Sequence, residues 1–398
     1  MSLGVKFYSY FDLSGYGLAA LAYLRGLLNA GVRVQWIPLI WNEQGYSGLQ
    51  PTDSPPLVEL TRDDASLRDL AAIRAATCHP VDYSSVFVQT VPELWPNFLE
   101  PGKKNVGYTT WEADALPPHW KSSLDLADLI CVPSEMNEVV FRAAHLKAPV
   151  HVLPHIRRHA WNDFTAGELQ ALRTSLGIPA DHFIFYSINT WEPRKNNPQL
   201  LKSFLEAFDA DSRVTLILKT DEEGYGPAPF YPRQATTDLA SIAMSDVNAD
   251  KEGAQAQVCL LPHKLSGRGI DMLHAIGDCY VSASRGEGWA MGAFDAATRG
   301  TPVVMTGWGG QTDYLGNDWP GAIPFNMRTV PVWPPSAPSF WPPQRWAEPV
   351  PDAMVAALKR AVTDAPRQKA AAQTIASDIA NRFAEPMVTE QLIALLHA

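Results

Sequence analysis

The chain alternates short apolar runs with longer amphipathic segments over almost all of its 398 residues. The first run, 5–10, alternates apolar and polar positions, and after a Gly-containing turn the apolar residues of 18–28 recur at helical spacing. Gly31 is placed to end that helix, and a further apolar run over 32–40 predicts a second strand. The chain therefore begins with a predicted β-α-β unit.

The same alternation continues towards the C-terminus and predicts an α/β fold. Helix-length segments separate the runs, which is typical of parallel sheets with helices on both faces. A helix over 164–176, closed by Gly177, precedes a strand that restarts the pattern, so a domain boundary is expected near 158–165. Further strands are predicted at 85–90, 105–109, 129–133, 150–154, 182–188, 214–218, 258–261, 279–282 and 301–305.

Length and composition agree with two Rossmann-like domains. A chain of 398 residues exceeds one ordinary core, and we expect domains over 1–160 and 161–385, with a C-terminal helix, 386–398, packing back on the first. The Pro- and aromatic-rich stretch 321–344 has no periodicity and predicts a long surface loop. The four cysteines show no CxxC spacing, and most lie in apolar runs typical of core packing.

Charge and hydropathy narrow the possible partners and location. The formal net charge of -10 disfavours a general nucleic-acid or anionic-membrane surface. No apolar run approaches the roughly 20 residues of a membrane span, and the first residues lack the pattern of a secretory signal. We therefore expect a cytoplasmic protein.

Two Gly turns within 282–314 mark the most informative stretch. Each turn follows a predicted strand, and because carboxyl ends of parallel strands meet at one sheet edge, we expect the turns to lie side by side. Glu287 lies in the first turn, and Asp295 in the short helix that follows it. Glycine lets backbone N–H groups approach a phosphate or sugar closely, so a ligand site is predicted at this edge.

Arg194 and Lys195 lie between the strand 182–188 and an amphipathic helix. Two cations beside the free N–H groups of a helix start are typical of an anion site. By contrast, the pair Asp209 and Asp211 follows a helix instead of a strand end, so it is interpreted as a turn and not as a metal site.

The histidine and tryptophan residues offer further candidates. His151, His155 and His159 have a spacing of four, but Pro154 interrupts any helix, so a metal role is disfavoured and His155 is kept as a candidate for polar contact with a substrate. Rings at predicted strand ends could stack on a sugar face. They are Trp111, Trp289 and Trp308.

The first turn contains Gly15, Gly17 and Ala20 in a spacing similar to a dinucleotide-binding fingerprint. The second strand, however, lacks the acidic residue that such a site uses for the ribose. The turn is interpreted either as a loop whose backbone lies over a ligand phosphate or acceptor, or as a simple helix start. An NAD(P)-dependent oxidoreductase stays an alternative.

Three segments, SGYG (14–17), PRKNNPQLLKSF (193–204) and RGEGWAMGAFDAATRGTPVV (285–304), together resemble the retaining GT-B glycosyltransferases of glycosyltransferase family four. The resemblance covers nearly the whole chain. It implies two Rossmann-like domains with parallel sheets facing an interdomain cleft, in which the C-terminal domain holds a nucleoside-diphosphate sugar.

The resemblance also implies roles for residues. Lys195 and Arg194 would neutralise the diphosphate, and Glu287 would contact hydroxyls of the donor sugar, so Glu287 and Lys195 are the expected catalytic residues. Asp295 stands where the family usually has a second Glu, and Asn189 where it often has an Arg. The remaining expected donor contacts are Gly288, Trp289, Ala290, Met291, Gly15 and Gly17, and the acceptor-side candidates are Trp111, Glu112 and His155.

The implied activity is transfer of a hexose, with retention, to a glycan or other hydroxyl acceptor. No cofactor or metal is expected, because the two cations would do the work of a metal ion. A lipid-linked glycan acceptor would bring the protein to the inner face of a membrane as a peripheral protein. A non-catalytic glycan-binding protein on the same fold is the other alternative.

Overall fold

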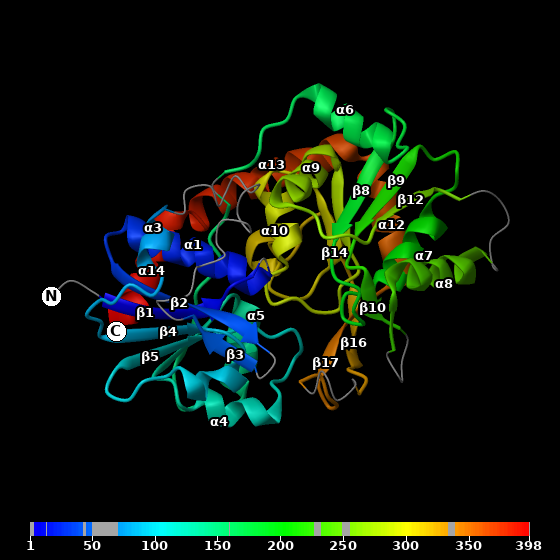
Figure 1. The fold of residues 1–398 in the computed structure, drawn as a ribbon. Helices are drawn as coiled ribbons and strands as arrows, with labels where there is room; N and C mark the ends of the chain where they lie inside the picture. The colour runs from blue at the N-terminus through cyan, green and yellow to red at the C-terminus, as the bar shows by residue number, and fades with distance from the viewer. Residues whose placement is uncertain are drawn as a thin grey trace. The chain divides into compact units, whose positions relative to one another are not determined.

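A computed structural model describes residues 4–12, 14–42, 45–49, 71–158, 160–226, 232–248, 255–332 and 339–397. The interpretation of His159 falls outside these residues. The chain forms two compact units (Figure 1). The first comprises Met1–Trp111, Ala115–Trp161 and Ile379–Ala398, and the second Glu112–Asp114 and Asn162–Asp378.

The first unit contains a seven-stranded sheet in the order β3-β2-β1-β4-β5-β6-β7. Every neighbouring pair is parallel except β2 and β3, so the predicted parallel α/β arrangement is confirmed. The strand order reverses between β1 and β4. The strands are β1 (Gly4–Tyr10), β2 (Arg33–Asn42), β3 (Gly45–Gly48), β4 (Ser85–Gln89), β5 (Lys104–Tyr108), β6 (Leu129–Val132) and β7 (Val150–Val152).

Helix α1 (Gly15–Asn29) covers one face of this sheet together with α14 (Glu385–His397). It begins three residues earlier than predicted because the Ser14 side chain caps it, accepting a hydrogen bond from the Gly17 N–H. The apolar side chains Val388 and Leu392 of α14 belong to the same core as α1. The other described helices of this unit include α3 (Ala71–Ala76), α4 (Lys121–Leu124), α5 (Glu135–Ala143) and the 3-10 turns η2 (Pro92–Asn97) and η3 (Pro118–Trp120).

The second unit is built on a six-stranded, all-parallel sheet in the order β12-β9-β8-β13-β14-β15. Here the strand order reverses between β8 and β13. The strands are β8 (Phe183–Ile188), β9 (Val214–Lys219), β12 (Gln257–Leu261), β13 (Cys279–Ser282), β14 (Val303–Thr306) and β15 (Ala322–Ile323).

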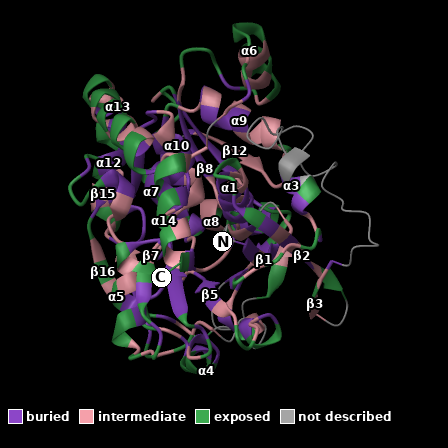
Figure 2. Ribbon diagram, turned by 90° about the vertical axis from the view of Figure 1, so that its left-hand side faces the viewer, coloured by how far each residue is buried: buried purple, intermediate pink, exposed green. Residues whose placement is uncertain are grey.

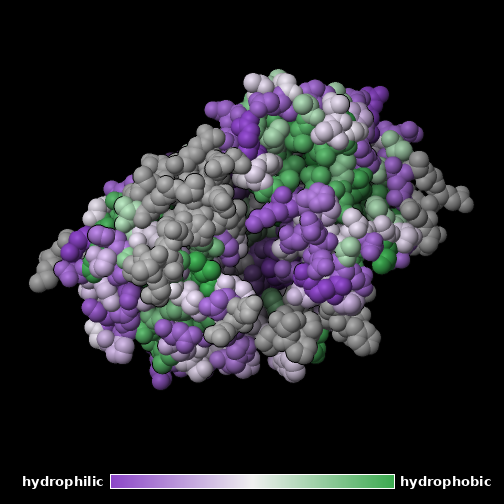
Figure 3. Space-filling model, in the orientation of Figure 1, coloured by the Kyte–Doolittle hydropathy of each residue, from purple (hydrophilic) through white to green (hydrophobic). Residues whose placement is uncertain are grey.

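Helices lie on both faces of this sheet, as the alternating pattern predicted. One core joins the sheet to α7, α8 and α12, whereas α6 has no buried residue and lies on the surface (Figure 2). Apolar side chains gather over β8, β9 and β12 in the view of Figure 3. The helices are α6 (Ala166–Ser175), α7 (Asn197–Ala207), α8 (Thr236–Asn248), α9 (Gly267–Ile276), α10 (Met291–Thr298), α11 (Thr312–Leu315), α12 (Pro351–Thr363) and α13 (Ala365–Arg382).

The prediction of a continuous surface loop over 321–344 was wrong. The segment contributes β15 to the parallel sheet and then β16 (Phe325–Thr329), which pairs antiparallel with β17 (Arg345–Pro349). Such pairing is set by a partner strand distant along the chain, and the alternation in β16 is too short to stand out among the prolines and tryptophans. A second small hairpin, β10 (Glu223–Tyr225) with β11 (Arg233–Ala235), follows β9.

Several smaller predictions can be checked directly. The Asp209 carboxylate accepts hydrogen bonds from the Asp211 N–H and the Ser212 hydroxyl, which confirms a turn there. All four cysteines are free, and only Cys259 is less than fully buried. None of the helices formed by the described residues has the length and apolar character needed to cross a membrane.

Candidate functional site

The candidate site lies at the carboxyl edge of the second unit's sheet, where the strand order reverses. The loop after β8 carries Arg194 and Lys195, and the loop after the neighbouring strand β13 carries Glu287. In open α/β sheets such a reversal leaves a crevice at the carboxyl ends of the strands, and ligands bind there.

The loop after β8 turns tightly before α7. The backbone N–H groups of Lys195 and Asn196 both donate to the carbonyl of Glu192, at 3.0 and 3.3 Å. Asn196 adopts the left-handed conformation, with φ 55°, and α7 begins at the next residue. Asn189, at the start of this loop, donates from its amide to the hydroxyls of Ser187 and Ser282 and so links the ends of β8 and β13.

Backbone hydrogen bonds join this loop to the loop after β13. The Arg285 N–H donates to the Arg194 carbonyl at 2.8 Å, and the Ser284 hydroxyl lies 3.4 Å from the same oxygen. Gly286 has no room for a side chain, because a Cβ atom there would overlap the carbonyl of Glu112. The two loops therefore form one connected structure.

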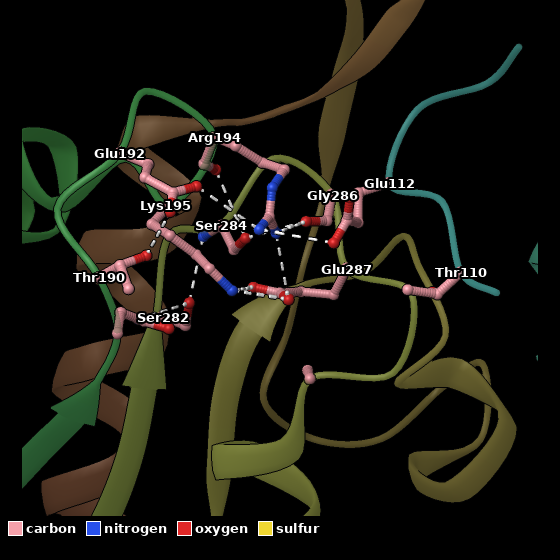
Figure 4. A network of polar contacts seen from close by, with 12 residues as sticks. Thr110, Glu112, Thr190, Glu192, Arg194, Lys195, Ser282, Ser284, Gly286 and Glu287 are labelled. Carbon is pink, nitrogen blue, oxygen red and sulfur yellow. Dashed lines mark hydrogen bonds and ion pairs between the residues drawn. The ribbon is translucent and has the colours of Figure 1, made fainter. Parts of the chain in front are cut away.

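Charged side chains from these loops converge (Figure 4). The Lys195 ammonium donates to both carboxylate oxygens of Glu287, at 2.7 and 2.9 Å. The Arg194 guanidinium donates to the Gly286 carbonyl at 2.7 Å and to Glu287 at 3.3 Å. Its other terminal nitrogen lies 3.5 Å from Glu112 and 3.7 Å from Glu192.

Burial and charge set the protonation of this cluster. Burial raises the pKa of Glu287, but the attraction of Lys195 and Arg194 is larger in sum and leaves that pKa below its ordinary value. Burial also raises the pKa of Glu112, and here the two cations do not reverse the shift. Burial opposes the charge of Arg194, yet the nearby carboxylates hold its pKa above the ordinary value, so Arg194 is always a cation.

The second Gly turn, after β14, lies directly beside the first. The Gly310 N–H donates to the Glu287 carbonyl at 2.8 Å. Gly309 has φ 131°, and a Cβ atom there would come within 2.9 Å of the same oxygen, so glycine is required on both counts. Because β13 and β14 are parallel neighbours, the prediction that the two turns share one sheet edge is confirmed.

The residues after Glu287 lead into α10. Gly288 is buried, Ala290 takes a left-handed conformation with φ 65°, and Met291 begins the helix. The Trp289 ring is 3% exposed and packs against Phe294 and Tyr314, so in this structure it contacts other rings instead of open space.

Asp295 lies in the middle of α10 and is 8% exposed. It lies close enough to Tyr280 to raise the pKa of that phenol, although burial is the larger cause. Trp308, on the second Gly turn, is half-buried, and its ring would lie 3.3 Å from a Cβ atom added at Gly286.

The candidates in the first unit occupy different settings. Gly17 is required because a Cβ atom would overlap the Asp12 carbonyl, and Gly15 is exposed at the start of α1. The Trp111 ring is 3% exposed and packs edge-on against Trp120. His155 is buried beside two tyrosine rings, and burial lowers its pKa to about 3. The third acceptor-side candidate, Glu112, belongs to the second unit and to the charged cluster.

The sequence did not single out Glu192, Arg285 or Glu348 as part of this region. Glu192 and Arg285 lie within or beside the recognised segments, so their nearness to Lys195 and Glu287 along the chain was a usable signal. Glu348 lies in β17, in a strand that was not predicted, and no local signal marked it. In the described parts of the chain, no group of three or more histidine, cysteine, aspartate or glutamate side chains is arranged to hold a metal ion.

No family model and no curated protein matches the sequence. Solved structures do match the fold over nearly the whole chain. HepE from Anabaena, in complex with UDP-glucose, is 16% identical with a TM-score of 0.62, and the match covers 99% of both chains. Sucrose-phosphate synthase from Thermosynechococcus elongatus is 13% identical with a TM-score of 0.63, covering 99% of this chain and 98% of the other.

A third similar structure is α,α-trehalose 6-phosphate synthase from Burkholderia multivorans, at 11% identity and a TM-score of 0.63, with 100% of this chain and 98% of the other covered. At these identities the likeness is one of fold. The chain has the GT-B glycosyltransferase fold, with two parallel α/β sheets, as the resemblance implied.

Proposed function

We propose that this protein is a retaining glycosyltransferase that moves a hexose from a nucleoside-diphosphate sugar to a hydroxyl acceptor. The observation that carries the proposal is the convergence of Lys195, Arg194 and Glu287 at the strand-order reversal of the second unit's sheet. Cations fixed at this edge suit a diphosphate, and a carboxylate beside them suits the hydroxyls of the attached sugar.

The proposed chemistry follows from where charge develops. When the bond from the sugar to the diphosphate breaks, negative charge grows on the leaving phosphate, and cations already in place stabilise that charge. Arg194 and Lys195 take this role. No protein nucleophile is assigned, and no divalent cation is required, because the two side chains supply the positive charge.

Donor binding has to rearrange the cluster. Arg194 and Lys195 carry two positive charges, while three carboxylates surround them, those of Glu287, Glu112 and Glu192. A diphosphate would add further negative charge. Lys195 therefore exchanges its two contacts with Glu287 for contacts with phosphate, and the released Glu287 carboxylate turns to accept from sugar hydroxyls.

The remaining donor contacts in this proposal lie close by. The backbone of Gly288 to Met291 leads into the start of α10, and in this proposal Asp295 of that helix accepts from the ribose hydroxyls. Asn189 supplies an amide at the end of β8. In this proposal the first unit takes the acceptor, around Gly15 and Gly17 and with Trp111 and His155 as further candidates. Glu112, which belongs to the second unit, is the acceptor-side candidate in the charged cluster.

A panel of UDP-, GDP- and ADP-sugars tests the proposal, with release of the free nucleotide as the readout and a chelator added to half the samples. UDP-glucose is the first donor to try, because HepE has been solved with that ligand. We expect release from one nucleotide class, undiminished by the chelator, and NMR of the product should show the donor's anomeric configuration. Binding of no nucleotide or nucleotide-sugar in the panel would contradict the proposal.

The same panel separates the alternatives. A non-catalytic glycan-binding protein would bind a polysaccharide yet release no nucleotide from any donor. An NAD(P)-dependent oxidoreductase would instead bind NADH tightly in a fluorescence titration. That alternative has less support, because Gly17 is already explained by the Asp12 carbonyl.

A further inference from the structure

Glu348 lies outside the proposed donor contacts, yet its carboxylate touches both loops that carry them. In β17, one oxygen of Glu348 accepts from the Asn196 amide at 3.2 Å. The guanidinium of Arg285 donates to the two oxygens at 2.5 and 3.1 Å. Asn196 directly follows Lys195, and Arg285 precedes Glu287 by two residues, so one carboxylate bridges the two sides of the site.

Arg285 extends this bridge through the backbone. Its guanidinium also donates to the Pro193 carbonyl, and its N–H donates to the Arg194 carbonyl. The Ala347 N–H of β17 donates to the Arg285 carbonyl at 2.8 Å. Backbone and side chain together therefore tie the loop after β13 to β17 and to the residues just before Lys195.

Asn196 shows why the contact with Glu348 matters locally. Its φ of 55° and ψ of 38° lie in the left-handed region, which residues other than glycine seldom adopt. Asparagine is among the residues that tolerate this conformation best. The Asn196 side chain makes no capping hydrogen bond to α7, although asparagine often does so at this position. The amide of Asn196 is instead directed at Glu348, which holds in place the residue between Lys195 and the helix.

The energetics separate a positioning role from a purely structural one. The side chains of Arg285 and Glu348 are 21% and 28% exposed, so this pair is not deeply buried. Partly exposed ion pairs contribute little to global stability. Misplacing a charged group by about 1 Å, in contrast, can cost on the order of 100-fold in rate. Loss of the bridge should therefore affect the site more than the fold.

We propose that Glu348 is a positioning residue that holds the loops of Lys195 and Glu287 at a fixed separation for the donor diphosphate. This inference rests on the proposed function. The hairpin of β16 and β17, which was absent from the sequence prediction, then acts as a brace for the donor site.

Hydrogen–deuterium exchange tests the brace without any ligand. The variant is Glu348→Gln, and the matched control is Arg328→Gln, an exposed charged residue on the paired strand β16. We expect the amides of Lys195 and Asn196 to exchange about tenfold faster in Glu348→Gln, because they depend on the tight turn at Glu192, while α12 and the control stay unchanged. Equal exchange at these two amides in all three proteins would overturn the proposal.

Calorimetric titration with UDP then tests the link to the site. We expect Glu348→Gln to weaken UDP binding about tenfold. In a protein that already carries Lys195→Ala, the same substitution should weaken UDP binding less than twofold further, because the effects of two residues on affinity are not additive when one acts through the other. A full tenfold further loss in the Lys195→Ala protein would overturn the positioning role. Failure of the unsubstituted protein to bind UDP, GDP or ADP would contradict the proposed function instead. The hydrogen-exchange result alone would then decide whether Glu348 holds the two loops in place.

Discussion

Replacing Lys195 with alanine perturbs the centre of the proposed site. The substitution removes both hydrogen bonds to Glu287 and leaves that carboxylate, whose side chain is 7% exposed, with Arg194 at 3.3 Å. Breaking a buried ion pair by removing one partner costs about 3–5 kcal/mol. Lys195 is itself 15% exposed and Arg194 stays in place, so we expect a smaller loss of folding free energy, about 2 kcal/mol.

The loss of turnover should be much larger than this loss of stability can explain. Removing one preorganised group that stabilises the transition-state charge typically lowers kcat by about 10²–10³-fold. A domain with an unfolding free energy of only about 5 kcal/mol would stay about 99% folded after losing 2 kcal/mol. Reduced folding would therefore leave the rate almost unchanged.

The assay is nucleotide release from the preferred donor, with thermal unfolding measured on the same samples. The control is Lys202→Ala, which removes an exposed lysine from α7, next to the same loop, where it pairs only distantly with Glu206. We expect the control to keep the rate of the unsubstituted protein. If Lys195→Ala also kept its kcat/KM within about threefold, the role given to Lys195 in leaving-group stabilisation would be refuted.

Three further predictions concern stability and its pH dependence. Gly17→Ala should lower the free energy of unfolding by about 1–3 kcal/mol in urea titrations, because the new Cβ atom overlaps the Asp12 carbonyl. His155 has a folded-state pKa of about 3, below its unfolded value near 6.5. The unfolded state therefore binds the proton more readily, and the free energy of unfolding falls as pH drops below 6.5. The variant His155→Phe should show a shallower fall between pH 6.5 and 5. The folded-state pKa of Glu287 is also lowered. The contribution of its carboxylate to the free energy of unfolding is therefore present above its unfolded pKa and is lost as pH falls below about 4.5. Glu287→Gln should flatten the dependence of stability on pH in that acidic range, and an unchanged curve would contradict the assigned ion pair.

The sequence was most informative where local patterns decide the structure. Most strands of the two sheets coincide with the apolar or alternating runs that predicted them, and the glycine turns after β13 and β14 marked their shared edge. The resemblance implied that Lys195 and Glu287 contact one donor, and each residue follows a predicted strand, so they were expected to lie close together. Their direct contacts agree with that reasoning.

The sequence was less informative where partners are distant. The pairing of β16 with β17 depends on residues on either side of a proline-rich stretch, so the bridge from Glu348 to Arg285 and Asn196 could not be predicted. Burial was also hard to anticipate. The rings of Trp111 and Trp289 lie at strand-end loops, as expected, but other aromatic rings pack against them, which an inspection of single residues does not reveal.

The most direct test of the central claim is a crystal structure of the protein soaked with the nucleoside diphosphate that it binds. The account predicts the diphosphate at the carboxyl ends of β8 and β13, about 3 Å from the Lys195 ammonium and near Arg194, with the Lys195–Glu287 contact opened. A nucleotide bound instead at the turn of Gly15 and Gly17, with Lys195 still paired to Glu287, would contradict it.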